Sequence, residues 1–158
     1  MAYKRFTASA KQLTPDPRFG SKLVAKFINY MMLSGKKTAS QKLVYDALDI
    51  IGERIKDATP LEVFEKAIEN IKPRLEVRSK RVGGANYQVP MQVSVKRQLS
   101  LSFRWVRDAV RAGSGQAISQ RLARELSDAY KGEGAAMTTR ENIHRMADAN
   151  KAFAHFAW

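Results

Sequence analysis

The chain has 158 residues, a length typical of one domain, and 44% of them are hydrophobic, close to the globular norm of ~45–50%. It carries 28 Lys and Arg against 15 Asp and Glu, a formal net charge of +13. A nucleic acid is therefore the first expected partner, and an acidic membrane surface is the second. The absence of cysteine excludes disulfides, thiolate metal sites and a cysteine nucleophile.

The sequence lacks the features of a secreted or membrane-spanning protein. No apolar run approaches the ~18 residues that a membrane span needs. The first twelve residues carry charge but no apolar segment, so no secretory signal is expected there.

Residues 1–20 are expected to form an irregular basic arm. The segment LTPDPRFG places two prolines and a glycine within eight positions, which interrupts regular structure. The cations of this arm are Lys4, Arg5, Lys11 and Arg18. We expect a loose arm whose cations can reach phosphates.

Two amphipathic helices are predicted next. The first carries apolar residues at helical spacing over residues 23–32, with Ser21 as its N-cap and Gly35 at its end. The second is predicted over residues 38–56, because its apolar residues again recur with a period near 3.6.

A capping box predicts the start of the third helix. Thr59-Pro60-Leu61-Glu62 combines an N-cap threonine, a proline at the first helical position and a glutamate at the third. Pro73 ends this helix. Glu62, Glu65 and Glu69 form an acidic stripe on it, which we expect to face solvent or a protein neighbour rather than phosphates.

A β-hairpin, here called the ribbon, is predicted over residues 74–96, where the apolar period changes from 3.6 to 2. Gly83-Gly84 lies between the two alternating runs, which is a strong turn signal. Because only the base of a two-stranded ribbon can lean on the helices, we expect its tip to project.

The register of the ribbon has two alternatives. An odd-length loop centred near the second glycine faces Leu75 and Val77 to Met91 and Val93, and gives the ribbon one apolar face. A two-residue loop instead places cations, Arg78 among them, on the face of Met91 and Val93. Since a one-residue slip exchanges the faces, we favour the odd-length loop.

The ribbon is the most basic part of the chain. Between positions 72 and 97 there is one acid, Glu76, and there are seven cations: Lys72, Arg74, Arg78, Lys80, Arg81, Lys96 and Arg97. A projecting cationic ribbon suits a groove lined with phosphates, and Tyr87 near the tip could stack on an unpaired base. The alternative interpretation is an edge strand that its lysines protect from aggregation.

Three further helices follow. One is predicted over residues 99–111, and the loop AGSGQ separates it from the next, which ends near Gly132. Thr138-Thr139-Arg140-Glu141 reads as a second capping box that opens the last helix, which continues through Phe153. The fold class is therefore mainly α, a single-domain bundle of about six helices with an extended β-hairpin inserted between the third and fourth.

Two further groups of cations join the arm and the ribbon. Arg104, Arg107 and Arg111 follow one another at i, i+3 and i+7 beside the apolar stripe of the fourth helix. Lys36 and Lys37 lie just past the first helix, where they could equally complement its dipole. The predicted nucleic-acid-binding set is Lys4, Arg5, Lys11, Arg18, Lys36, Lys37, Arg74, Arg78, Lys80, Arg81, Tyr87, Lys96, Arg97, Arg104, Arg107 and Arg111.

No enzyme, cofactor or metal site is predicted. His144 and His155 are the only histidines, and neither has partners at metal-binding spacing. The sequence contains no nucleophile elbow and no phosphate-binding glycine loop. We interpret His144 as a surface residue that makes a hydrogen bond.

Four segments resemble the small-subunit ribosomal protein seven family of the bacterial and plastid type. They read DPRFGSKLVAKFINYMMLSGKKTASQKLVYDAL, RVGGANYQVP, RLARELSDA and RENIHRMADANKAFAH. The resemblance runs nearly end to end, and it implies a helical bundle with an extended β-ribbon. It also implies a location within the ribosome, in a bacterial cytoplasm or a plastid stroma.

The resemblance further implies a primary rRNA-binding protein, without a cofactor. Such a protein binds the 3′ major domain of small-subunit rRNA and nucleates assembly of the subunit head, with its ribbon near the exit-site tRNA and the mRNA path. Ribosomal proteins nine, eleven and thirteen of that subunit are the implied neighbours. The family's rRNA-contacting parts match Lys4, Arg5, Lys36, Lys37, Arg78, Lys80, Arg81 and the arginines of the fourth helix.

Two rival functions remain open from the residues. An architectural DNA-binding protein also uses basic ribbons that carry a proline, as this one carries Pro90. A membrane-surface protein would need broad apolar helix faces beside its basic ones, whereas the apolar stripes here are all needed for a core.

Overall fold

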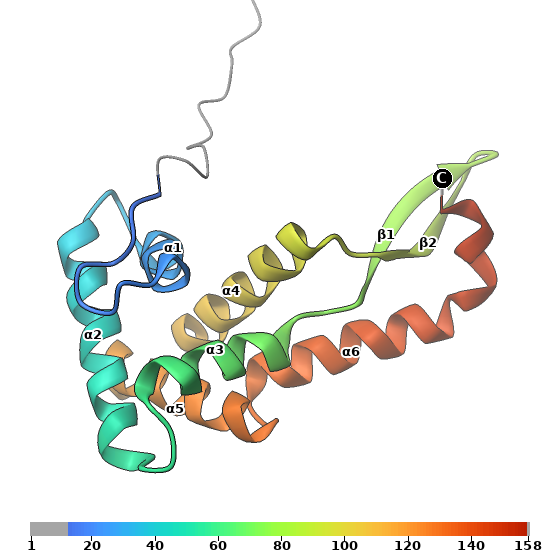
Figure 1. Ribbon diagram of the computed structural model, residues 1–158. Coiled ribbons are helices and arrows are strands. Elements are labelled where there is room, and N and C mark those ends of the chain that lie inside the picture. Colours follow the sequence, from blue (N-terminus) through green and yellow to red (C-terminus); the bar gives the residue numbers. More distant parts are fainter. Residues whose placement is uncertain (1–12, 158) are drawn as a thin grey trace, which may run out of the picture.

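The computed structural model describes residues 13–157, so Lys4, Arg5 and Lys11 of the predicted arm lie outside the described residues. Its α-helices are α1 (Lys22–Met31), α2 (Lys37–Arg54), α3 (Pro60–Ile71), α4 (Val95–Ala112), α5 (Ile118–Lys131) and α6 (Ala135–Ala149) (Figure 1). The hairpin consists of β1 (Leu75–Val82) and β2 (Ala85–Gln92), and a 3-10 helix, η2, spans Lys151–Phe156. The predicted mainly α fold with a hairpin between the third and fourth helices is confirmed.

Helices α1 to α5, with the first turns of α6, form the body of the molecule around one apolar core. Phe27, Phe64 and Phe103 lie at its centre and are completely buried. The ring centroid of Phe27 lies 5.3 Å from that of Phe64 and 5.2 Å from that of Phe103, distances typical of favourable aromatic pairs. These rings come from three helices, so the core joins α1, α3 and α4 directly.

Local capping explains where several helices begin and end. The side chain of Thr59 accepts from the backbone N–H of Glu62, and Glu62 accepts from the backbone N–H of Thr59, which confirms the first capping box. Ser21 caps α1 as predicted. Gly132 ends α5 in the left-handed conformation, with φ of 91°.

The second predicted capping box is wrong. Helix α6 begins at Ala135, four residues before Thr139, where the predicted box would start it, and the hydroxyl of Thr138 donates to the carbonyl of the N-cap residue Gly134. The N–H of Ala136, in the first turn of α6, instead donates to a carboxylate oxygen of Glu125 on α5, at 2.7 Å. A residue from another helix thus replaces the local cap, which the sequence pattern alone does not reveal.

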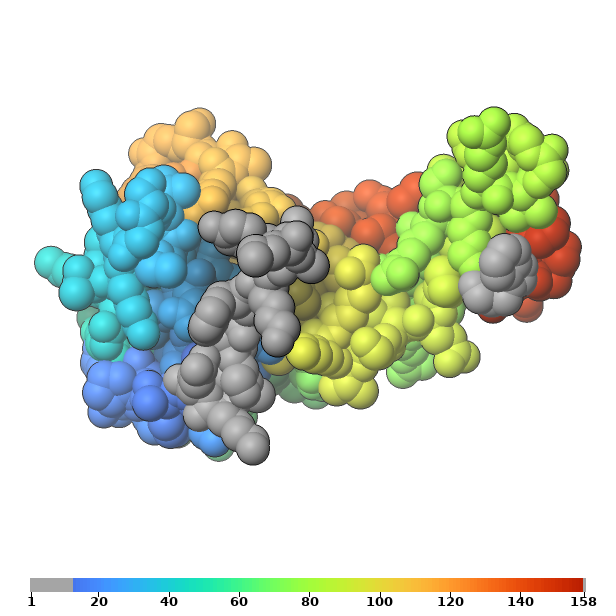
Figure 2. Space-filling view, turned by 90° about the horizontal axis from the view of Figure 1, so that it is seen from above, coloured from blue at the N-terminus to red at the C-terminus, as the bar shows by residue number. Residues whose placement is uncertain are grey.

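The ribbon and the end of the chain form a second unit, here called the ribbon lobe, which comprises β1, β2, the last turns of α6 and η2. In Figure 1 α6 extends from beneath the body and turns upward into η2, and the ribbon rises beside it. β1 contacts α6 and β2 contacts η2. The space-filling view shows the lobe set off to one side of the body (Figure 2).

The predicted odd-length loop is wrong, and the ribbon has the two-residue turn. Val82 pairs with Ala85 across Gly83-Gly84, whose φ values of 56° and 89° suit a type I′ turn. Arg78 pairs with Val89 and Lys80 with Tyr87, so these cations share a face with apolar residues. The prediction failed because it required an apolar face, whereas the packed face includes a buried, paired glutamate.

Two helix boundaries also differ from the predictions. Helix α1 ends at Met31 rather than at Gly35, and α4 begins at Val95, four residues before the predicted start. The last helix is not continuous through Phe153: α6 stops at Ala149, and the chain tightens into η2.

The described part of the predicted loose arm, residues 13–20, packs against α2. Asp16 is buried and accepts hydrogen bonds from the backbone N–H groups of Arg18 and Phe19 and from the hydroxyl of Tyr45. The guanidinium of Arg18 lies over the rings of Phe19 and Tyr45. A buried carboxylate with three donors therefore fixes a segment that its prolines and glycine predicted to be loose.

Candidate nucleic-acid interface

One buried carboxylate organises the cations at the base of the ribbon. The side chain of Glu76 is only 10% exposed, and its two oxygens contact Arg78 at 2.5 Å and Arg97 at 2.6 Å. Arg97 belongs to α4, so this bridge ties β1 to the body. Both arginines remain more than a third exposed, and phosphates can therefore still reach them.

The rest of the ribbon presents cations unevenly. Arg74, Arg81 and Lys96 are exposed. Lys80 is half-buried, and its ammonium group donates to the backbone carbonyl of Phe156 at 3.1 Å. The tip is therefore held by the end of the chain on one side, contrary to the prediction that only the base is supported.

The ring of Tyr87 packs against other aromatic rings of the same chain. Its ring centroid lies 5.2 Å from that of Phe153 and 5.2 Å from that of Phe156. The aromatic residues of η2 thus already pack against the ring of Tyr87, which the sequence suggested for stacking on a base. A base would have to compete with these contacts or to use the exposed part of the ring.

His144 anchors the entrance of the ribbon. Its Nε2 accepts the backbone N–H of Arg74 at 3.1 Å, which agrees with the predicted hydrogen-bonding role. Burial lowers the pKa of His144 below its ordinary value, and the positive charges of Arg140 and Arg74 lower it further against the opposite effect of Asp148. An unprotonated Nε2 is needed for this hydrogen bond, so the imidazole is neutral in the folded arrangement.

Lys36 and Lys37 lie at the start of α2, not at the end of α1, because Met32 is already extended and residues 33–36 form a turn. Both side chains are exposed. The predicted stabilisation of a helix C-terminus by these lysines is therefore wrong. At a helix N-terminus the dipole disfavours cations, so this placement favours an anion as a partner.

The last three arginines of α4 make two kinds of contact, within their own helix and with the end of α1. Arg104 is exposed and donates to the hydroxyl of Ser100 within the helix, and Arg107 pairs with Asp108. Arg111 donates to the backbone carbonyl of Met31 at 3.2 Å. Arg111 therefore joins the end of α4 to the last residue of α1, just before the turn that leads to Lys36 and Lys37.

Arg18 stands apart from these groups. Its guanidinium forms a bidentate pair with Asp49 of α2, with N–O distances of 2.6 and 3.0 Å. The candidate cations in the described residues thus form two groups, one at the base of the ribbon and one at the start of α2. Arg18 and the last three arginines of α4 lie apart from both groups.

The comparisons with known proteins cover nearly the whole chain. The family model described as ribosomal protein S7p/S5e matches residues 3–151. The chain belongs to this family. Three relatives carry the name small ribosomal subunit protein uS7: the protein of Rhodopirellula baltica is 61% identical, that of Thermotoga maritima 52% and that of Desulfotalea psychrophila 50%. Each alignment spans 155 residues, 98% of this chain and 99% of the relative.

Membership in the S7p/S5e family makes the chain a structural ribosomal protein, and the family is not known for enzymes. In the described residues no group of three or more acidic, histidine or cysteine side chains could hold a metal ion. No helix of that same part is both long and apolar enough to cross a membrane.

Two arginines of α5 are absent from the predicted nucleic-acid-binding set. Arg121 and Arg124 line a pocket of about 380 Å³ beside the loop that contains Gly113 and Gly115. The sequence suggested an uncharged loop there, since AGSGQ contains no cation. The two arginines are three residues apart on α5, so they lie on one face of the helix. Side chains on a helix point back toward its N-terminus, and this spacing could have indicated that both reach the loop before α5.

Proposed function

We propose that the protein is a constituent of the small ribosomal subunit that binds the 3′ major domain of its rRNA and nucleates assembly of the head. The observation that carries this proposal is the end-to-end similarity to proteins named small ribosomal subunit protein uS7, at 61% identity in the most similar case cited above. The arrangement of cations supports the RNA-binding part. The relatives are bacterial, which supports a cytoplasmic location for the ribosome concerned.

Binding in this proposal depends on cations held at fixed separations. A-form RNA hides its bases in a deep major groove, so a protein recognises a folded RNA through phosphates and shape. The body holds Lys36, Lys37 and Arg104, and the bridge at Glu76 holds the ribbon cations at a distance from them. Only an RNA fold whose phosphates match both groups would release the full set of counterions.

The proposed role in assembly uses the same two groups of cations. Because the two groups of cations lie on different units of one chain, an RNA bound to both has its own segments held in a defined relation. This would prepare the surface for ribosomal proteins nine, eleven and thirteen. The ribbon would then lie near the exit-site tRNA and the mRNA path.

The principal rival is an architectural DNA-binding protein. Such proteins insert a ribbon into the minor groove, with side chains at the tip wedged between bases. Here Lys80 and Tyr87 are packed against η2 on one side of the ribbon. This support leaves only part of the ribbon available to a groove and favours the RNA proposal.

A competition experiment tests the proposal. The full chain is titrated with a transcript of the 3′ major domain and with duplex DNA of equal charge, at one physiological salt concentration. We expect the transcript to bind at least tenfold more tightly, because only it offers matched phosphates on two faces. Equal or tighter binding of the duplex would contradict the proposal.

A further inference from the structure

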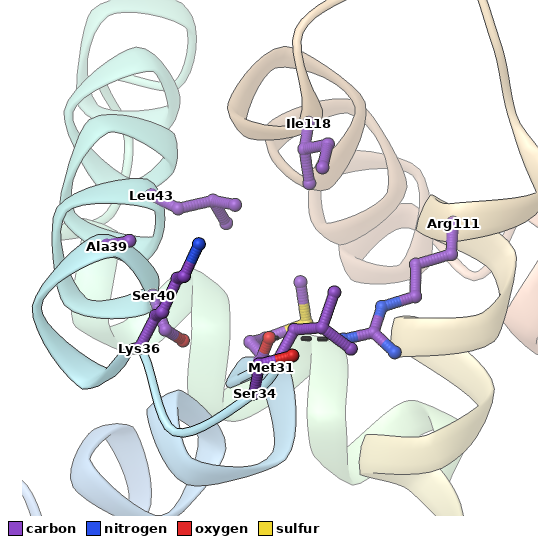
Figure 3. A pocket seen from close by; sticks show the side chains of 9 residues that line it. Met31, Ser34, Lys36, Ala39, Ser40, Leu43, Arg111 and Ile118 are labelled. Carbon is purple, nitrogen blue, oxygen red and sulfur yellow. Dashed lines mark hydrogen bonds between the residues drawn. The ribbon is translucent and has the colours of Figure 1, made fainter.

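The turn between α1 and α2 leads into a small pocket that lies between two of the cations described above, Lys36 and Arg111. Its volume is about 200 Å³, below the ~300–1,000 Å³ of pockets that hold drug-sized ligands. The residues that line it are Met31, Leu33, Ser34, Lys36, Ala39, Ser40, Leu43, Arg111 and Ile118. They come from the α1–α2 turn, α2, the end of α4 and the start of α5, which meet at this point (Figure 3).

The walls of the pocket are aliphatic and unusually exposed. Among the described residues four large hydrophobic side chains are exposed, and two of these, Leu33 at 66% and Ile118 at 39%, line this one pocket. Leu43 and Met31 continue the apolar surface inward. Exposed apolar side chains gathered at a hollow indicate a binding site more often than scattered ones do.

The rim of the pocket is cationic. Lys36 extends toward Leu43 on one side, and the guanidinium of Arg111 lies on the other, fixed by its hydrogen bond to the carbonyl of Met31 (Figure 3). None of the described residues that line the pocket is acidic. One of the five donors of Arg111 is used in that bond, and a guanidinium can serve several acceptors at once.

We propose that this pocket receives one unpaired nucleobase of the bound RNA, with the phosphates on either side of it held by Lys36 and Arg111. This inference rests on the proposed function. A base offers two flat, weakly polar faces, which suit the aliphatic walls, and its nucleotide is anionic, which suits the rim. The small volume matches one ring system and not a helix or a lipid tail.

Three variants of the full chain test the proposal by RNA binding. Leu33→Ala removes an exposed wall, and Ala39→Phe fills the pocket from an exposed position; neither changes the charge. We expect each to weaken binding of the rRNA transcript about five- to tenfold, because a base contact is lost. The slope of log K against log[salt] should stay unchanged, since no counterion release is lost. Met146→Ala, which shortens a side chain that is 50% exposed on α6, is the matched control and should bind normally.

A second measurement observes the pocket directly. In a chain labelled with ¹³C at the methionine methyl groups, adenosine monophosphate should shift the Met31 resonance through the ring current of the base. Ribose 5-phosphate, which has the phosphate but no base, should leave it in place. A shift with the nucleotide alone, lost in Ala39→Phe, supports the proposal.

Separate outcomes overturn separate claims. If the wild-type chain binds the transcript but neither variant weakens it and Met31 does not shift, the pocket proposal is wrong and the proposed function stands. If the transcript does not bind, the proposed function fails, and the mononucleotide shift alone supports or overturns the pocket. A Met31 shift with an acidic leucine-containing peptide, but not with the nucleotide, overturns the proposal in favour of a protein partner.

Discussion

The body and the ribbon lobe are held together by different forces. In the body, Phe27, Phe64 and Phe103 are fully buried, and the ring of Phe27 packs against the other two, so that three helices meet there. In the lobe, β1 is tied to α4 by the carboxylate of Glu76, and β2 meets η2 through partly exposed aromatic rings.

This difference gives a physical reason for where the candidate RNA-binding cations lie. Apolar burial stabilises roughly in proportion to area, so the body tolerates a high net charge on its surface. The lobe buries less apolar surface, and β1 is tied to the body through the single carboxylate of Glu76, whose arginine partners are partly exposed. It is therefore the unit that an RNA can hold, adjust or order without disturbing the core.

The largest expected effect is in the body. Phe103→Ala should lower the free energy of unfolding by about 3–5 kcal/mol, because it removes a fully buried ring and leaves a cavity. Urea denaturation measures this loss. Val95→Ala, at a side chain that is 74% exposed, is the control and should change stability by no more than about 0.5 kcal/mol. Equal stability of both variants would mean that the core lies elsewhere.

The ribbon should dominate the salt dependence of RNA binding. Replacing Arg78, Lys80 and Arg81 together by Ala should reduce the slope of log K against log[salt] by up to about 2–3 units, one for each lost phosphate contact. Filter binding across a salt series measures the slope. An unchanged slope would remove the ribbon from the interface.

A matched triple variant controls for the loss of charge itself. Arg54, Lys56 and Lys66 are exposed cations on the end of α2, just after it, and on the acidic helix α3. Their replacement by Ala removes the same charge away from the ribbon. It should leave the slope nearly unchanged, and an equal drop in both triple variants would show that only net charge matters.

Glu76→Gln tests the link between the two units. The variant keeps the shape of the side chain but removes the charge that pairs with Arg78 and Arg97. We expect a loss of about 1–2 kcal/mol of stability, reduced from the buried-pair value because both arginines are partly exposed. Hydrogen exchange should show faster opening of β1 and β2 than of α3. Uniform exchange in both units would contradict separate stability.

The smallest expected effect is a pH dependence through His144. Its pKa in the folded chain is below the ordinary value, so its contribution to stability is present above that ordinary value and is lost as the pH falls through the folded pKa. Melting curves recorded between pH 7.5 and 5 should show this loss of stability. The loss should be smaller than the one that Glu76→Gln causes. His144→Gln should flatten the curve, and an unchanged pH dependence in this variant would contradict the assignment to His144.

The body was largely predictable because its signals are local. The capping box at Thr59, the N-cap at Ser21 and the apolar stripes all act within one or two helical turns, and the structure confirms them. The misplaced start of α6 is the informative exception. There the deciding contact comes from Glu125, ten residues before the helix.

The candidate interface was predictable in its residue types but not in its arrangement. The cations of the ribbon are evident in the sequence, yet the register chosen for them was wrong. The sequence does not show that a glutamate would be buried between Arg78 and Arg97, or that Phe153 and Phe156 would fold back onto Tyr87. The contacts of Glu76 with Arg97 and of Tyr87 with the two phenylalanines join residues 21 to 69 positions apart, and no local periodicity in the sequence predicts them.

The amino-acid sequence by itself determined the helical class, the position of the hairpin and the excess of positive charge, because periodicity, caps and composition act over short distances. Only the tertiary structure decided which face of the ribbon is covered, where Lys36 and Lys37 stand relative to a helix dipole, and that four elements enclose a pocket beside them. These depend on the pairing of distant side chains, whose free energy exists only once the chain has closed on itself.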